Sequence, residues 1–172
     1  MYSVGQQVIY GIHGVCDIIG IEERSVDRKT VPYFVLVPRD HPDSRYYLPS
    51  LNPAALKKIR PLTKKEDLLR YWSEPLDESR WIPAENKRKQ VYRDLIAEAQ
   101  ADCLVHILRC LSRYKAELDQ VGKKFHLSDD NFMRDARRIL AGEMAVVLDI
   151  EQRSALKTID GLLEDALKMA AV

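Results

Sequence analysis

Trp81 lies beside a cluster of basic side chains, a pairing that suits contact with nucleic acid. From Ser79 to Arg93 the chain carries five basic residues against one acidic residue, Glu85. An indole can insert against or between bases while nearby Lys and Arg neutralise phosphates, as in proteins that distort duplex DNA from the minor groove. The alternative is a tryptophan buried at the start of a helix, which is the commoner fate of an aromatic side chain. Residue types and spacing alone leave both interpretations open.

A second set of side chains has metal-binding chemistry. Cys103, His106 and Cys110 are spaced i, i+3 and i+7, so a helix would present all three on one face, and thiolates with imidazole bind zinc. No fourth ligand accompanies them, and the same face carries Ile107 and Leu111. The pattern favours a packed core over a metal site. We expect no metal and no cofactor; a metal-dependent enzyme built on these residues is the alternative, and elemental analysis for zinc tests it.

Motifs of catalysis are missing from the sequence. It contains no phosphate-binding loop, dinucleotide fingerprint or hydrolase motif. His13, before Gly14, has no carboxylate or nucleophile at a recognisable spacing. We therefore expect a protein that is not an enzyme.

Composition narrows the class of protein further. The chain has 172 residues, of which 46% are hydrophobic and 31% charged, and a formal net charge of +1. A net charge this close to zero argues against a broad polyanion-binding surface, although charge is unevenly placed along the sequence. No apolar run approaches the ~18 to 20 residues that span a bilayer, and the N-terminus lacks a secretory pattern. Three scattered cysteines do not form a disulfide framework. These features predict a cytoplasmic protein without a membrane partner.

The two parts of the chain differ in hydrophobic periodicity. Up to residue 62, short β-branched and aromatic runs separated by turn residues predict strands at 8–10, 15–21, 33–37 and 45–49. Strands this short and closely spaced favour a small antiparallel barrel. From residue 63 onward, apolar residues recur at helical spacing and predict a bundle. The fold class is α+β, with a β domain at 1–62 and an all-α domain at 63–172.

Three signals predict where helices begin. Thr63 and Glu66 have the spacing of a capping box. Pro83 suits the first turn of the helix that follows Trp81. Ser128 is a good N-cap for a helix that runs through the apolar residues from Phe132 to Met144.

Several motifs together resemble the CarD/CdnL/TRCF family. The opening pattern of that family, V-G-D-x-V-V-Y-P-x-H-G-V-G-x-I-x-x-I-E, is followed by a Y-Y-V-L strand, a strand ending in Pro, a closing lR-x-l element and a helical A-x-x-x-L-x-x-E-L region. The matching segments here are 4–10, 13–15, 18–23, 33–36, 47–49, 58–62 and 136–144. The resemblance covers nearly the whole chain and points to a full-length CarD-type regulator.

The resemblance implies a bacterial transcription regulator in which a Tudor-like or SH3-like β domain docks on the β subunit of RNA polymerase. It implies that the helical domain meets promoter DNA, with Trp81 in the minor groove at the upstream edge of the melted bubble, and that this stabilises the open complex. The polymerase-binding residues implied are Arg24, Val26, Tyr47 and Pro49. The DNA-binding residues implied are Trp81, Arg80, Asn86, Lys87, Arg88 and Lys89.

Some positions depart from the family pattern. Gly11 and Cys16 stand where the family usually has Pro and Gly, and Tyr47 lies where relatives can carry Arg. Pro83 and Asn86 fall where some relatives carry basic residues, so we expect the phosphate contacts to shift to neighbouring cations. We expect a monomer, with a domain-swapped dimer as an alternative. The alternative function is an RNA polymerase adaptor whose helical part binds a protein partner without touching DNA, with Trp81 packed inside the bundle.

Overall fold

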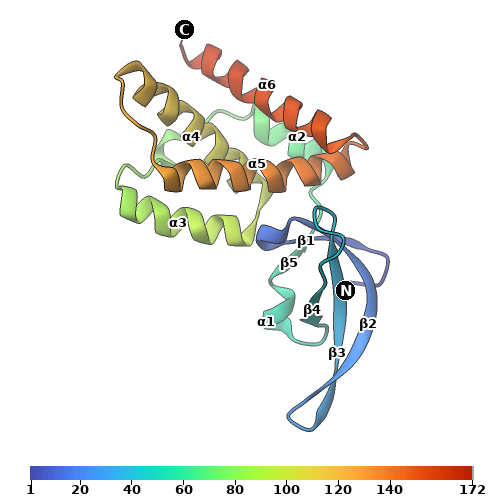
Figure 1. The fold of residues 1–172 in the computed structure, drawn as a ribbon. Helices are drawn as coiled ribbons and strands as arrows, with labels where there is room; N and C mark the ends of the chain where they lie inside the picture. The colour runs from blue at the N-terminus through green and yellow to red at the C-terminus, as the bar shows by residue number, and fades with distance from the viewer. Residues whose placement is uncertain (172) are drawn as a thin grey trace. The chain divides into compact units, whose positions relative to one another are not determined.

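The chain divides into two compact units, Met1–Leu62 and Thr63–Val172. The structure is a computed structural model and describes residues 1–171. The first unit is built on a sheet and the second on helices (Figure 1). This architecture confirms the predicted fold class of a small antiparallel β domain followed by an all-α region.

A single antiparallel sheet forms the first unit. Its strand order is β4-β3-β2-β1-β5, so β4 and β5 lie at the two edges. Each strand pairs with a neighbour in antiparallel register, and the β2–β3 register shifts between Ile18 and Gly20. The strands are β1 (Gln7–Tyr10), β2 (Val15–Val26), β3 (Lys29–Pro38), β4 (Tyr46–Pro49) and β5 (Ile59–Pro61).

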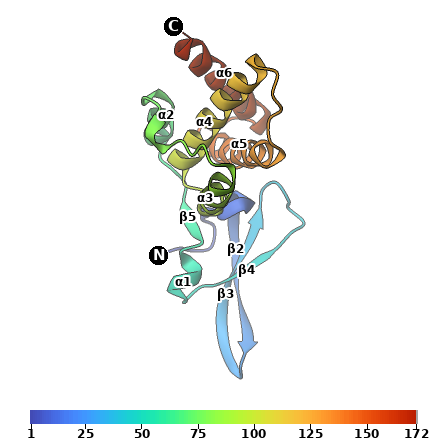
Figure 2. The same cartoon turned by 90° about the vertical axis from the view of Figure 1, so that its left-hand side faces the viewer.

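The β2–β3 hairpin extends well past the rest of the sheet, as both cartoon views show (Figures 1 and 2). All of residues 21–30 are exposed. The two turn residues, Asp27 and Arg28, have φ of 49° and 64°, the positive values that a type I′ hairpin turn needs. The outer half of the hairpin is therefore a two-stranded ribbon that carries no core of its own.

The core of the first unit lies on one face of the sheet. It is closed by the short helix α1 (Pro53–Leu56), whose N-cap Asn52 accepts a hydrogen bond from the backbone N–H of Ala54 at 3.0 Å. A single 3-10 turn, η1 (Gly11–His13), joins β1 to β2. The buried members of the core are Val8, Cys16, Ile18, Phe34, Leu36, Leu48, Ala55 and Ile59.

Helices make up the second unit. Helix α5 packs against α3, α4 and α6, and α2 packs on α4. Buried residues recur at helical spacing on each of the long helices, as with Ala155, Ile159 and Leu163 on α6. The helices are α2 (Lys65–Ser73), α3 (Glu85–Glu98), α4 (Ala101–Gln120), α5 (Leu127–Val147) and α6 (Gln152–Ala170), with the 3-10 turn η2 (Glu78–Arg80) between α2 and α3.

All three predicted helix-start signals are wrong. The N-cap of α2 is Lys64, and the backbone N–H of Thr63 instead donates to the carboxylate of the buried Glu143 at 2.7 Å. Pro83 precedes α3, whose N-cap is Ala84. The N-cap of α5 is His126, so Ser128 lies inside the helix. In each case the helix begins one or two residues from the position that the local signal indicates.

Candidate nucleic-acid and polymerase interfaces

The connector between α2 and α3 carries Trp81 and is held against α4 by arginines. The guanidinium of Arg109 donates to the carbonyl oxygen of Glu74 at 2.7 Å. Further along, Arg113 forms an ion pair with the Glu78 carboxylate and a second one, at 3.2 Å, with Glu117 on its own helix. The connector is therefore anchored to α4 at two points before it reaches Trp81.

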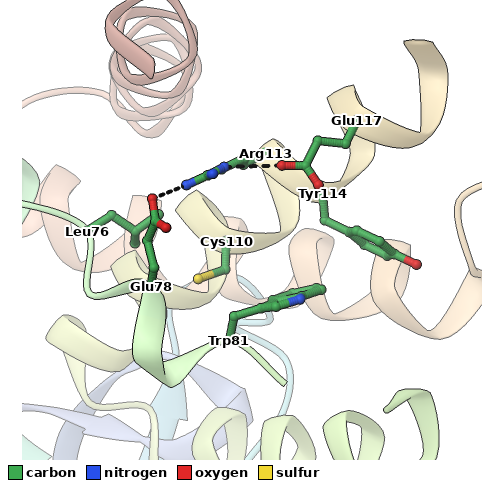
Figure 3. A pocket seen from close by; sticks show the side chains of 7 residues that line it. All are labelled: Leu76, Glu78, Trp81, Cys110, Arg113, Tyr114 and Glu117. Atoms are coloured by element: carbon green, nitrogen blue, oxygen red, sulfur yellow. Dashed lines mark hydrogen bonds and ion pairs between the residues drawn. The ribbon is translucent and has the colours of Figure 1, made fainter. Parts of the chain in front are cut away.

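The Trp81 side chain lies on the surface of α4, half-buried and outside the interior of the bundle. Its ring centroid is 4.9 Å from that of Tyr114, with the two rings tilted by 47°. Its backbone N–H donates to the carbonyl of Glu78 at 3.1 Å, which closes η2. The indole also lines a pocket of about 260 Å³ together with Cys110 and Arg113 (Figure 3). One side of the indole is packed and another borders open space.

Arg88 corrects a prediction made from the sequence. The residue is buried, and its guanidinium forms a bidentate pair with the carboxylate of Asp129 at 3.0 and 2.6 Å. This hydrogen bonding raises the pKa of Arg88 above its ordinary value. The residue lies on the buried face of α3 with Tyr92 and Ile96. The Arg88 guanidinium is not accessible to a phosphate, and the expectation that it contacts DNA is wrong for this structure.

The other residues predicted to contact DNA differ in how available they are. Arg80, Asn86 and Lys87 are exposed, and within residues 1–171 Lys87 takes part in no ion pair. A guanidinium nitrogen of Arg80 lies 3.7 Å from the sulfur of Cys103, a weak contact that leaves its charge at the surface. Lys89 is paired with Glu85 at 2.5 Å, and its hydrogen bond lowers the pKa of that carboxyl group.

The cysteines and histidine of α4 are packed, as the sequence pattern favours. His106 is 7% exposed, and its Nε2 lies 3.3 Å from the sulfur of the buried Cys110. Burial lowers the pKa of His106 to about 4, and burial raises that of Cys110 to about 11. Cys103 is half-buried and faces Arg80. Within the part of the chain that the structure describes, no three His, Cys, Asp or Glu side chains are grouped so that they could hold a metal ion.

In the first unit, Arg24 and Tyr47 are in contact. The guanidinium carbon of Arg24 lies 3.4 Å from the centroid of the Tyr47 ring, which is a cation–π geometry. Arg24 also forms a 3.8 Å ion pair with Glu22, and both side chains are about half-exposed. A charged group and an aromatic ring from two strands thus form one partly exposed cluster.

Comparison with known families bears on this first unit. Residues 2–62 match the family model of the CarD-like/TRCF RID domain. This unit is RID-like. The family is transcription-related, and its domains interact with RNA polymerase. None of the curated proteins matches the chain.

The four residues predicted to bind polymerase lie on one face of the RID-like unit. Pairing places Tyr47 opposite Val35 and Pro49 opposite Tyr33, and Tyr33 in turn opposite Glu22. Residues paired across strands, and residues two apart along a strand, share a face of a sheet. The face that carries Tyr47 and Pro49 is therefore the face that carries Arg24 and Val26. Val26 is 42% exposed at the tip of the hairpin.

Sequence reasoning missed the residues that hold Trp81 in place. Tyr114 and Arg113 come from α4 and Asp129 from α5, between 32 and 48 positions from Trp81 in the chain. Helical spacing offered one usable signal, because Arg88, Tyr92 and Ile96 follow one another at intervals of four. This spacing puts Arg88 in line with the apolar stripe of its helix.

Among the described residues, no helix combines the length and the apolar character that crossing a bilayer requires.

Proposed function

We propose that this protein is a full-length CarD-type transcription regulator that acts by binding, without catalysis. The RID-like unit docks on the β subunit of RNA polymerase, and the helical unit presents Trp81 to the minor groove of promoter DNA at the upstream edge of the melted bubble. The match of residues 2–62 carries the polymerase half of this proposal. The surface position of Trp81, at a clamped connector and beside open space, supports the DNA half.

The energetic logic is differential binding. A ligand shifts a two-state equilibrium only by the difference between its affinities for the two states. An indole that wedges against unstacked bases contacts melted DNA and finds no equivalent contact in a closed duplex. Stacking of a base on an aromatic ring is worth about 1–3 kcal/mol. At the midpoint of that range, about 2 kcal/mol, a single wedge lengthens the lifetime of the open complex by about thirtyfold.

Phosphate contacts in this proposal come from Arg80, Asn86, Lys87 and Lys89. The last of these must exchange its partner Glu85 for a phosphate, whereas Lys87 is available without any exchange. So few cations give modest affinity for free DNA, with a slope of about −0.9 in log affinity against log salt for each phosphate contacted. Attachment to polymerase then supplies most of the effective concentration at the promoter.

The wedge is tested by replacing Trp81 and, as a matched control, the other tryptophan of the helical unit, Trp72 on α2. Trp81→Ala is expected to shorten the lifetime of a promoter open complex by about thirtyfold, because about 2 kcal/mol of stacking energy is lost. Trp72→Phe is expected to leave that lifetime unchanged. The measurement is the decay of preformed open complexes after addition of a competitor, with polymerase binding measured in parallel. Equal lifetimes for Trp81→Ala and the unmodified protein contradict the wedge.

The polymerase interface is tested by charge reversal. Arg24→Glu is expected to weaken binding to the isolated β-subunit lobe, because it replaces the cation over the Tyr47 ring with an anion. Arg39→Glu is the matched control: Arg39 is also a half-exposed, ion-paired arginine of the RID-like unit, with Asp17 at 3.3 Å as its partner. Calorimetric titration against the lobe distinguishes the two. Identical affinities for both variants remove Arg24 from the interface.

One observation favours a second candidate, an RNA polymerase adaptor that never touches DNA. The rim of the pocket beside Trp81 carries the carboxylates of Glu78 and Glu117 against the single cation of Arg113, and this excess of negative charge repels a phosphate backbone. In that case Trp81 anchors a protein partner instead. Cross-linking from position 81 in the polymerase–promoter complex separates the two candidates, because the adaptor yields a protein adduct and the wedge yields a DNA adduct.

A further inference from the structure

A buried arginine lies directly beneath the Trp81 segment. Residues 81–84 belong to no helix or strand, so their backbone groups depend on other partners. The guanidinium Nη1 of Arg88 donates to the carbonyl oxygen of Ile82 at 2.9 Å and to that of Pro83 at 3.1 Å. These are the two residues that follow Trp81. One side chain thus fixes the backbone on the C-terminal side of the indole.

The same guanidinium also faces the aromatic rings. Its carbon lies 4.9 Å from the centroid of the Trp81 ring and 5.2 Å from that of Tyr114. Both distances are within the range of a cation–π interaction, which is strongest on tryptophan. Trp81 is therefore held by ring contacts with Tyr114 and Arg88 as well as through its neighbouring carbonyls.

Asp129 supplies the counter-charge. Its carboxylate accepts hydrogen bonds from Nε and Nη2 of Arg88. The exposed fraction of the side chain is 0% for Asp129 and 1% for Arg88. A buried charge needs such a partner, but a buried ion pair stabilises a fold no better than apolar residues of similar volume. Stability alone does not explain this pair. Its distinguishing feature is the remaining donor, Nη1, which is directed at the Trp81 segment.

We propose that Arg88 is a positioning residue for Trp81, oriented by Asp129 from α5, and that it holds the indole in one place before any partner binds. A fixed ring loses little conformational freedom on binding, which raises affinity without a new contact. The benefit to promoter opening rests on the proposed function. The ordering of Trp81 does not, because it is a property of the free protein.

The test uses the full chain with Trp72→Phe, so that Trp81 is the only tryptophan. The variant Arg88→Met/Asp129→Leu removes both charges and keeps the volume filled, so the unit is expected to fold. The control Arg137→Met/Asp160→Leu removes a second bidentate pair, whose two hydrogen bonds of 2.7 and 2.5 Å join α5 to α6. This pair does not contact Trp81. The measurements are acrylamide quenching and anisotropy decay of the indole, with circular dichroism to verify folding.

In the Arg88→Met/Asp129→Leu variant, the quenching constant of Trp81 is expected to rise roughly twofold and fast anisotropy decay to increase, because the segment opens locally. The control is expected to match the parent. Arg88→Lys, which keeps a charge for Asp129 but has no planar fork, is expected to give a smaller rise. Unchanged quenching in the folded double variant overturns the proposal. So does an unchanged value in Arg88→Lys if the double variant does not fold.

Open-complex lifetime is then measured for the same variants. A rise in quenching together with a lifetime shortened severalfold supports positioning in the service of promoter opening. If quenching rises in Arg88→Met/Asp129→Leu but neither that variant nor Trp81→Ala changes the open-complex lifetime, positioning is supported and the proposed function is overturned. If quenching is unchanged in Arg88→Met/Asp129→Leu while Trp81→Ala shortens the open-complex lifetime, positioning is overturned and the proposed function stands.

Discussion

Acidification is expected to destabilise the helical unit through His106. Burial is the main cause that lowers the pKa of this histidine to about 4, and the positive charge of Arg80 lowers it further. The ordinary pKa of histidine, which the unfolded chain has, is about 6.5. Between these two values the unfolded state binds a proton that the folded state rejects. Stability is therefore complete above pH 6.5 and falls as the pH drops towards 4.

The magnitude follows from the two pKa values. Each pKa unit of difference corresponds to about 1.4 kcal/mol, and by pH 5 the unfolded histidine is almost fully protonated while the folded one is almost neutral. The free energy of unfolding is expected to be about 2 kcal/mol lower at pH 5 than at pH 7 on account of this residue. With a typical urea dependence, that loss moves the unfolding midpoint by about 1 M.

Urea titration followed by tryptophan fluorescence measures this quantity for the helical unit alone, because Trp72 and Trp81 both lie in it. His106→Gln replaces the titrating ring with a neutral polar group. It is expected to remove about 2 kcal/mol of the difference in the free energy of unfolding between pH 7 and pH 5. His126→Gln, which changes an exposed imidazole of the same unit, is expected to keep most of it. If His106→Gln loses as much stability on acidification as the unmodified protein, the reasoning is refuted.

Further predictions concern buried charge and thiols. Asp129→Asn leaves Arg88 as an uncompensated buried cation and is expected to cost about 3–5 kcal/mol in chemical unfolding, whereas Arg137→Met, which breaks a half-exposed pair, is expected to cost about 1 kcal/mol or less. Comparable costs for the two contradict the buried-charge argument. Burial raises the pKa of Cys16 to about 12 and of Cys110 to about 11, so native thiol labelling at pH 8 is expected to modify the half-buried Cys103 first. Labelling of Cys16 at the rate of a free thiol shows that its site opens.

The sheet was largely predictable because its inner strands alternate or cluster apolar residues. The outer half of the β2–β3 hairpin was not, since residues 21–30 are exposed on both faces and carry no such pattern. Its pairing is set by backbone hydrogen bonds propagated from the core strands and by the tight turn at Asp27 and Arg28. Strand β5 is only three residues long, too short to give a periodic signal.

The sequence could predict which segment carries the candidate site, but not the contacts that its side chains make. Trp81 and its basic neighbours are adjacent in the chain, so composition alone revealed them. The burial of Arg88 depends on a carboxylate 41 positions away, on a helix that local patterns could not place beside it. Composition alone predicts a surface cation for any basic residue in a run of Lys and Arg. The local signal for burial is the interval of four residues that places Arg88 on the same helix face as Tyr92 and Ile96.

The turn of the β2–β3 hairpin has a consequence for the affinity of the proposed polymerase-binding face. Asp27 and Arg28 hold positive φ without the glycine that makes such turns easy, and each non-glycine residue in that region costs on the order of 1 kcal/mol. A two-stranded ribbon is only marginally stable in water. The order of the ribbon thus depends in part on its tip, whose residues are distinct from Arg24, Tyr47 and Pro49 of the proposed polymerase-binding face. Affinity can change through the turn alone, as loss or gain of entropy, while every contact surface stays the same.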